Sequence, residues 1–184
     1  NTPSTTDTVA DTAYPVANTA YYKLDSNAND SSGNGYNGTA TDVIYGNGRF
    51  NEAANFNGTS SRIPLPKITG ITADVSVSGW LSLGNTTTSN RIRFIEINTN
   101  ASGYAGTLSV YYKPSNGEWQ VRSGNSVDSN SNVLTHTYLL TQATWYNVCF
   151  TRDNTTNVTN FYVNGSLQDT ETVTVNSSYP AEAT

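Results

Sequence analysis

The chain has 184 residues, a length that suits a single domain with one substantial core, and only 12% of them are charged. Nine Lys and Arg stand against 14 Asp and Glu, so the net charge is −5 and no basic stripe can neutralise phosphates, which excludes nucleic acid from the expected partners. No apolar run approaches the ~18 residues of a membrane-spanning helix, so membrane insertion is not expected either.

The first 18 residues are typical of a linker or arm. The segment NTPSTTDTVADTAYPVAN contains small polar residues and two prolines, and it shows no sustained hydrophobic period. We expect the folded domain to span residues 19–184.

From residue 20 onward, short runs of β-branched and aromatic residues are separated by clusters of Asn, Gly and Ser, which predicts an all-β chain. The clearest run is DVSVSGWLSLG at residues 74–84, where Val and Leu alternate with Ser and Trp80. This alternation predicts one face in the core and one polar face. The candidate strands in chain order are AYYKLD, DVSVSGWLSLG, RIRFIEI, TLSVYYK, EWQVR, VLTHTYLL, WYNVCFTR, NFYVNG and TETVTV.

Two turn sequences predict hairpins toward the end of the chain. VNGS contains Asn164 and Gly165, a pair that tolerates positive φ at both turn positions, and RDNTTNV supplies a short polar turn between apolar strands. They predict an antiparallel meander over about residues 144–175.

Strands with one apolar face require a second layer. Because each half-apolar sheet needs another sheet to cover it, the expected architecture is an antiparallel two-sheet sandwich. Cys149 is the only cysteine, so no intrachain disulfide stabilises this sandwich, and in WYNVCF we expect a buried small side chain.

The motifs along this predicted sandwich resemble a known family. They are Leu-Asp at residues 24–25, DSSGNG at 30–35, GRF at 48–50 and ANFNG at 54–58, followed by VSVSGWLSL and TWYNVCFTRDNTTNVTNFYVNGSL. In these motifs and their order, residues 20–175 resemble the laminin-G-like jelly-roll modules of the concanavalin A-like lectin/glucanase superfamily.

The resemblance implies a concanavalin A-like fold, an all-β antiparallel two-sheet jelly-roll sandwich. Such modules mainly bind glycans or proteins at cell or virus surfaces, often with a bound calcium ion. Members usually close with a Gly-x-Ile-Asp-Asp-Val strand and a Tyr-containing tail, and nothing of this form follows Val175. Either the chain is a piece of a longer protein, or another chain completes the sheet.

The loop LDSNANDSSGNGYNG, residues 24–38, is the candidate metal site. Asp25, Asn27 and Asn29 match the alternating start of a calcium loop. Asp30 stands where an EF-hand has Gly, and Tyr36 stands where it has Glu, so an EF-hand is excluded.

Two interpretations of this loop remain. One is a looser structural Ca²⁺ site, whose ligands would be Asp25, Asn27, Asp30 and Asn34. The other is that Asp30 only holds a turn, accepting hydrogen bonds from the backbone amides of Ser32 or Gly33.

Enzyme activity is not expected. The superfamily includes glycosidases whose acids alternate on one strand as Glu-x-Asp-x-x-Glu or Glu-x-Asp-x-Glu, and no glutamate in this chain has an acid two residues on. His136 is the only histidine, and in LTHTYL we favour a structural strand residue over a general base.

Sugar binding needs aromatic faces for C–H surfaces and planar polar groups for hydroxyls. Tyr104 lies in the loop NTNASGYAG, and Trp119 follows a turn in SNGEWQVR, where it could stand at a rim. Arg91 and Arg93 share a strand face and could pair with Glu96 across a neighbouring strand or bind an anionic sugar. We take these two aromatic and two basic residues as the candidate carbohydrate-binding residues.

Trp80 is out of place in its strand. By a period of two it shares its face with serines. It must therefore lie either on a solvated sheet face or beneath a covering loop.

The expected function is that of a non-catalytic carbohydrate-binding or adhesion module. We expect it to be extracellular, displayed on a virion, as in a phage fibre or surface protein, or on a bacterial cell surface. Its expected partners are a glycan or a surface protein and the other subunits of a larger assembly. The rival hypotheses are a structural virion-surface domain without a glycan ligand and a glycoside hydrolase.

Overall fold

The computed structural model describes residues 18–68, 74–84, 90–97, 107–124, 132–153 and 155–172, so all but the last residue of the predicted linker at residues 1–18 lies outside the described part. The strands found in these ranges are β1 (Ile44–Asn47), β2 (Glu52–Asn55), β3 (Val75–Leu81), β4 (Ile92–Ile97), β5 (Thr107–Lys113), β6 (Glu118–Gly124), β7 (Asn132–Thr137), β8 (Tyr146–Asp153), β9 (Val158–Val163) and β10 (Ser166–Thr172).

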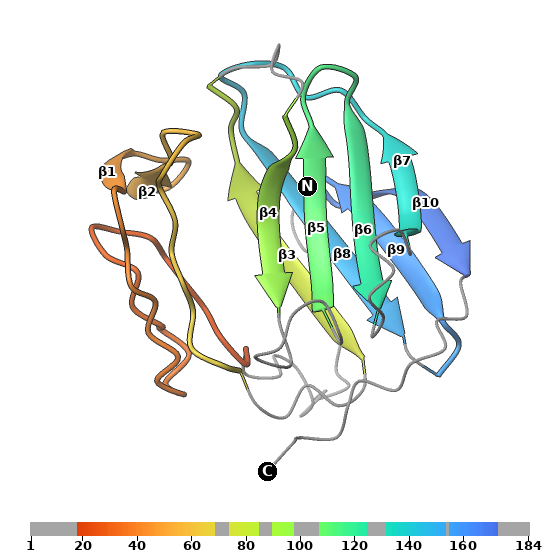
Figure 1. The fold of residues 1–184 in the computed structure, drawn as a ribbon, viewed down its shortest axis with the longest axis horizontal. Helices are drawn as coiled ribbons and strands as arrows, with labels where there is room; N and C mark the ends of the chain where they lie inside the picture. The colour runs from red at the N-terminus through yellow and green to blue at the C-terminus, as the bar shows by residue number, and fades with distance from the viewer. Residues whose placement is uncertain are drawn as a thin grey trace, which may run out of the picture.

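Two four-stranded antiparallel sheets face each other (Figure 1). The front sheet has the order β4-β5-β6-β7, and the back sheet has the order β10-β9-β8-β3, while β1 and β2 form a separate hairpin. This arrangement confirms the predicted antiparallel two-sheet sandwich.

The core lies between the two sheets and is centred on Trp119. Its ring centroid lies 4.6 Å from that of Tyr112, 5.7 Å from that of Phe150 and 5.3 Å from that of Phe161. The remaining strand residues that are buried at the centre of this core are Val110, Val121, Leu134, Val148 and Val163. Because these residues alternate along their strands, each sheet turns one apolar face inward.

Both predicted hairpins are confirmed. Asn164 and Gly165 adopt φ of 49° and 79°, as the turn between β9 and β10 requires. The carboxylate of Asp153 accepts hydrogen bonds from the amides of Thr155 and Thr156, and so holds the turn between β8 and β9.

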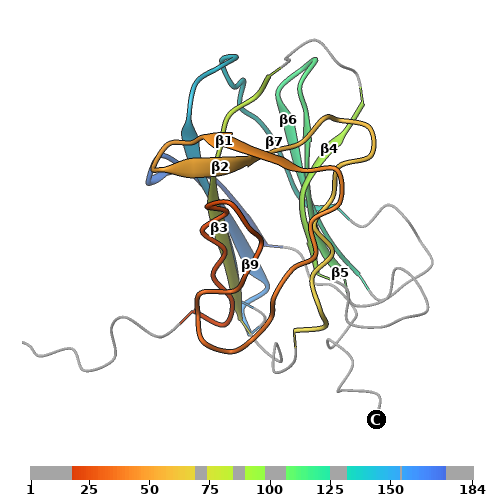
Figure 2. The ribbon, with the colours of Figure 1, turned by 90° about the vertical axis from the view of Figure 1, so that its left-hand side faces the viewer.

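Residues 18–68, which we call the entry segment, lie beside the sandwich along the side of β3 and β4 (Figures 1 and 2). The segment packs on itself: the amide of Gly38 donates to the carbonyl of Ala28 at 2.8 Å, and Thr39 donates to Pro64 at 3.0 Å. A Cβ at Gly38 would lie 2.6 Å from Cγ2 of Ile63, so this close approach requires glycine.

The predicted strand at residues 20–25 is wrong. Tyr22 forms only an isolated bridge to Asp30, and Leu24 and Ser26 adopt φ of 60° and 62°. A strand cannot continue through this left-handed conformation. The β1–β2 hairpin was not predicted as strands, and the last strand begins at Ser166 rather than near residue 170.

Candidate functional site

Asp30 holds the loop that the sequence marked as a candidate calcium site. Its carboxylate accepts hydrogen bonds from the backbone amides of Tyr21, Ser32 and Tyr36 at 2.8 to 3.0 Å and from the Ser32 hydroxyl at 2.7 Å. Partial burial raises the pKa of Asp30, but these hydrogen bonds together hold it well below its usual range. The predicted turn around Asp30 and Ser32 is therefore confirmed.

The other predicted calcium ligands are used in different contacts. The Asp25 carboxylate accepts from the amide of Glu52 at 3.1 Å, and the Asn27 side-chain oxygen accepts from the amide of Asn29 at 2.9 Å. Asn34 turns its amide nitrogen, not its oxygen, toward the carbonyl of Thr19 at 3.0 Å.

These contacts do not fit the predicted calcium site. A carboxylate has about four lone-pair positions, and the hydrogen bonds to Asp30 occupy all of them. In the described ranges no three His, Cys, Asp or Glu side chains form a group that could hold a metal ion. The loop is held by hydrogen bonds within itself and to Thr19, Tyr21 and Glu52 outside it.

The predicted rim position of Trp119 is wrong. Its side chain is 0% exposed, because the alternation along β6 points it into the core between the sheets. It cannot offer a ring face to a sugar. Tyr104, the other predicted aromatic residue, lies outside the described residues.

Arg91 and Arg93 lie at the exposed edge of the front sheet. Arg93 forms an ion pair with Glu96 of its own strand, not with a residue of a neighbouring strand as predicted. The register of β4 against β5 shifts between Arg93 and Ile95, and this bulge turns Arg93 and Glu96 to the same face.

The outward face of the front sheet is charged, and its polar groups contact one another. The guanidinium carbons of Arg93 and Arg122 each lie 5.4 Å from the Tyr111 ring centroid. Gln120 accepts from Arg122 at 3.2 Å and donates to Glu118. These neighbours form a row along β6 and across to β4 in which each charge has a protein partner.

This face also carries the carboxyl groups of Glu96 and Glu118. Glu96 is opposite Ser109, and Glu118 is opposite Lys113, with β5 between them. Strand spacing and rise place their Cα atoms about 16 Å apart, and the two carboxylates contact different partners, Arg93 and Gln120.

His136 joins the two sheets along the side away from the entry segment. Its Nδ1 lies 3.1 Å from Oδ2 of Asp169, and its ring packs edge-on against Phe161 with centroids 5.7 Å apart. Because these contacts tie β7 to β10 and β9, the predicted structural role of His136 is supported.

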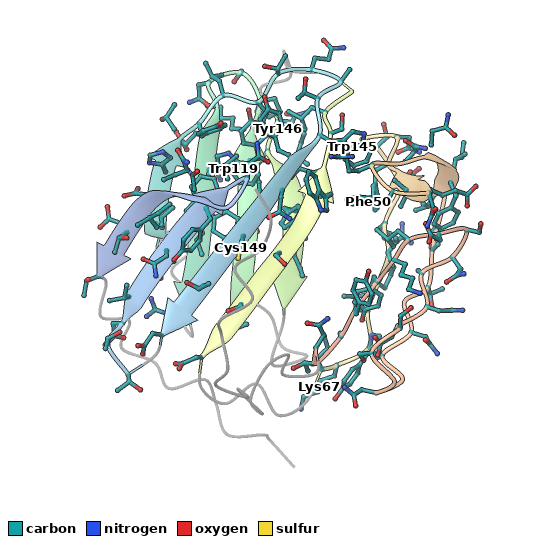
Figure 3. The ribbon with its side chains drawn as sticks, turned by 180° about the vertical axis from the view of Figure 1, so that it is seen from behind. Phe50, Lys67, Trp119, Trp145, Tyr146 and Cys149 are labelled. Carbon is teal, nitrogen blue, oxygen red and sulfur yellow. The ribbon has the colours of Figure 1, made fainter. Side chains whose placement is uncertain are left out.

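Figure 3 faces the outward side of the back sheet, and the strand registers make that face uncharged over most of its length. The strand registers place on it Ser76, Ser78, Trp80, Asn147, Cys149, Thr151, Asn160 and Tyr162. Asp74 and Asp153 lie at the other end of the face from Trp80, about 20 Å along the strands. Cys149 is half-buried rather than buried as predicted, and burial raises the pKa of its thiol.

Trp80 stands on this face beside the entry segment. Its side chain is 41% exposed, and the Phe50 ring, which is 61% exposed, lies at a centroid distance of 5.6 Å and an angle of 85°. Figure 3 draws Phe50 on the side of the entry segment nearest the end of β8 where Trp145 lies. Both predicted alternatives for Trp80 are thus partly realised, since the ring is solvated and also meets a loop.

The turn that carries Arg49 and Phe50 is tightly held. A Cβ at Gly48 would lie 2.5 Å from the carbonyl oxygen of Glu52, and the amide of Gly48 donates to the carbonyl of Asn51 at 2.9 Å. Asp25 accepts from the backbone of Glu52 and from the side chain of Asn51, at 3.1 and 3.4 Å. The loop predicted to bind calcium therefore supports the hairpin that meets Trp80.

The contact between the exposed rings of Trp80 and Phe50 was not predicted from the sequence. Phe50 was recognised only as part of a family motif, and Trp80 was noted only as an anomaly. The sharing of one strand face by a tryptophan and several serines is the signal that could have identified it.

None of the residues that the structure describes forms a helix long and apolar enough to span a membrane.

Comparison with known proteins agrees with this architecture. No curated protein matches the sequence. Among solved structures, domain 4 of AbnA, a GH43 extracellular arabinanase from Geobacillus stearothermophilus solved in complex with arabinotriose, is 22% identical, with a TM-score of 0.59 over 87% of this chain and 79% of that one. The family model of the concanavalin A-like lectin/glucanases superfamily matches residues 56–184, more than half of the sequence. The chain therefore belongs to the concanavalin A-like lectin/glucanase superfamily.

Proposed function

We propose that the protein is a non-catalytic carbohydrate-binding module and that the outward face of the back sheet is its binding surface. The observation that carries this proposal is the exposure of Trp80 on a strand whose neighbouring outward residues are Ser76, Ser78 and Asn147. Sugars present C–H faces, which stack on aromatic rings, and hydroxyl groups, which bind uncharged polar side chains. The face offers both kinds of contact within a few residues.

The solved structure that resembles this chain supports a glycan partner. Domain 4 of the arabinanase was solved with arabinotriose, and that enzyme is extracellular. We extend both properties to this protein as parts of the proposal, a carbohydrate ligand and a place outside the cell.

The positions of the front-sheet acids support binding rather than hydrolysis. Glu96 pairs with Arg93, and Glu118 accepts from Gln120, so each carboxylate is already engaged by a different protein group. A binding module needs no such pair.

We further propose that the module is displayed on a virion or a bacterial cell surface, where it adheres to a glycan or surface protein within a larger assembly. This part rests on the family motifs and on a surface rich in Asn, Ser and Thr with few charges. The rival hypothesis is a structural domain of the same fold with no glycan ligand.

A glycan array followed by calorimetry tests the proposal. We expect specific binding to at least one glycan and a loss of at least about tenfold in affinity in Trp80→Ala, because the variant removes the stacking surface. Tyr111→Ala on the front sheet is the matched control and should bind as the native protein does. Binding should persist in EDTA, since the 24–38 loop is held by hydrogen bonds.

Two results would contradict this proposal. Native affinity in Trp80→Ala together with lost affinity in Tyr111→Ala would move the site to the front sheet. The absence of binding to every neutral and acidic glycan on the array would favour the structural domain.

A further inference from the structure

The side chain of Arg49 lies against both exposed aromatic rings at the junction of the entry segment and β3. Its guanidinium carbon is 5.0 Å from the centroid of Phe50 and 5.1 Å from that of Trp80, and the two centroids are 5.6 Å apart. The three groups therefore form a nearly equilateral triangle, which we call the aromatic corner. A guanidinium stacked in this way is already oriented before any ligand arrives.

Arg49 has no anionic partner among the residues that the structure describes. No ion pair or hydrogen bond joins its guanidinium to another side chain or carbonyl in those ranges. The nearby acids have other contacts, because Glu52 accepts from the Ser26 hydroxyl and Asp25 accepts from the backbone of Glu52. Arg49 thus differs from Arg93 of the front sheet, which has its carboxylate partner in Glu96.

The shape of the Arg49 guanidinium indicates which ligand group it could bind. Its planar N–H donors match the two oxygens of a carboxylate in bidentate pairing. The rings beside it are apolar and exposed, and the strand residues that continue the face, Ser78 and Asn147, are small or uncharged hydrogen-bonding residues. A ligand that fits the whole corner carries one carboxylate, an apolar face and several hydroxyl groups.

We propose that the aromatic corner is a subsite for a uronic acid residue of an acidic glycan, in which Arg49 binds the carboxylate and Trp80 and Phe50 contact the C–H face of the ring. This inference rests on the proposed carbohydrate-binding function and specifies its ligand class. An acidic peptide is the alternative, but a peptide interface would call for a larger apolar surface than two rings above serine and asparagine.

The test compares two oligosaccharides that differ only at C6. Calorimetry with α-(1→4)-linked tetragalacturonate and the α-(1→4)-linked galactotetraose at low ionic strength isolates the contribution of the carboxylate. The native protein should prefer the acidic ligand by about tenfold, the usual worth of a charge-assisted pair. Arg49→Gln should reduce that preference to less than about twofold while keeping the weak neutral binding, and Arg49→Lys should fall between them because a lysine lacks the bidentate fork.

Arg62→Gln is the matched control. Arg62 is an exposed arginine of the same entry segment, and its guanidinium donates to the carbonyl of Ser60 at 3.3 Å, away from the aromatic corner. This variant loses the same charge and should keep the native preference. Thermal melting of both variants checks that neither change unfolds the chain.

The possible outcomes separate this inference from the proposed function. If the native protein binds both oligosaccharides equally, or if Arg49→Gln keeps the acidic preference, the uronate subsite is wrong while carbohydrate binding stands. If no glycan of any kind binds, both proposals fail. Tight binding of tetraglutamate that depends on Arg49 would replace the glycan with an acidic peptide.

Discussion

The two outward faces of the sandwich are built from the same kind of antiparallel strands, but the front face is charged and the back face is mostly uncharged. The front face gathers charged residues and gives them partners within the sheet, as Arg93 with the carboxylate of Glu96 and Arg122 with the amide oxygen of Gln120. The back face is uncharged near Trp80, and its one nearby cation, Arg49, comes from the entry segment and rests on aromatic rings. A surface whose charges have partners has less to offer a ligand than one with exposed rings and a guanidinium that has no carboxylate partner among the described residues.

The difference arises from where each face obtains its partners. The front face is completed by neighbours within its own sheet, so its polar contacts follow from the alignment of those strands. The back face is completed at one end by a hairpin from far earlier in the chain, which places Phe50 against Trp80. Ligand binding on the back face should therefore depend on the entry segment, and the front face should not.

The largest expected effect is the difference in unfolding free energy between replacing the buried Trp119 and replacing the exposed Trp80. Trp119→Ala should lower the free energy of unfolding by about 3 to 5 kcal/mol, because it empties the centre of a core shared with Tyr112, Phe150 and Phe161. Trp80→Ala should cost less than about 1 kcal/mol, since its ring is partly solvated. Urea unfolding of the two variants measures both, and similar losses would show that Trp80 belongs to the core.

Lowering the pH should destabilise the entry segment before it destabilises the sandwich. The folded-state pKa of Asp30 lies below its value in the unfolded chain, about 3.9, so its carboxylate stabilises the fold at higher pH and that contribution is lost as the pH falls through the folded-state value. Hydrogen exchange between pH 6 and pH 2.5 should show residues 18–38 losing protection before the front sheet. In Asp30→Asn the same residues should already be less protected at pH 6, and equal protection in both proteins would contradict the assigned role.

The smallest effect concerns the front-face ion pair. Glu96→Gln removes the partner of Arg93, and because that guanidinium is largely exposed the stability should change by less than about 1 kcal/mol and the change should shrink in high salt. Glycan affinity should not change. A marked gain in binding of acidic glycans would show that the released Arg93 competes with Arg49 as a carboxylate site.

Much of the sandwich could be predicted from local patterns. The alternation in VSVSGWL and in YNVCF places Val77 and Phe150 inward, and the Asn-Gly turn after Val163 closes a hairpin as expected. The strand predicted for AYYKLD does not form, although its residues fit a strand pattern. The amide of Tyr21 donates to the Asp30 carboxylate, and this contact holds the chain in a loop. A nine-residue contact of this kind leaves no periodic signal.

The candidate site was less predictable than the fold. Trp80 and Trp119 stand in similar strand sequences, yet one ring is exposed and the other lies at the centre of the core. Which face of a strand turns inward is clear only when both faces differ strongly in polarity, and Trp119 lies in EWQVR between polar neighbours. The position of Arg49 against Trp80 joins residues 31 positions apart and has no local signature.

The sequence by itself predicted an all-β antiparallel sandwich, because a period of two and well-placed turn residues are local properties, and its motifs indicated the concanavalin A-like family by their resemblance to it. Tertiary structure alone decided which aromatic ring faces solvent, which arginine has a carboxylate, and that Asp25 supports a hairpin. These outcomes depend on contacts between segments far apart in the chain, and such contacts exist only after the sheets and the entry segment have packed together.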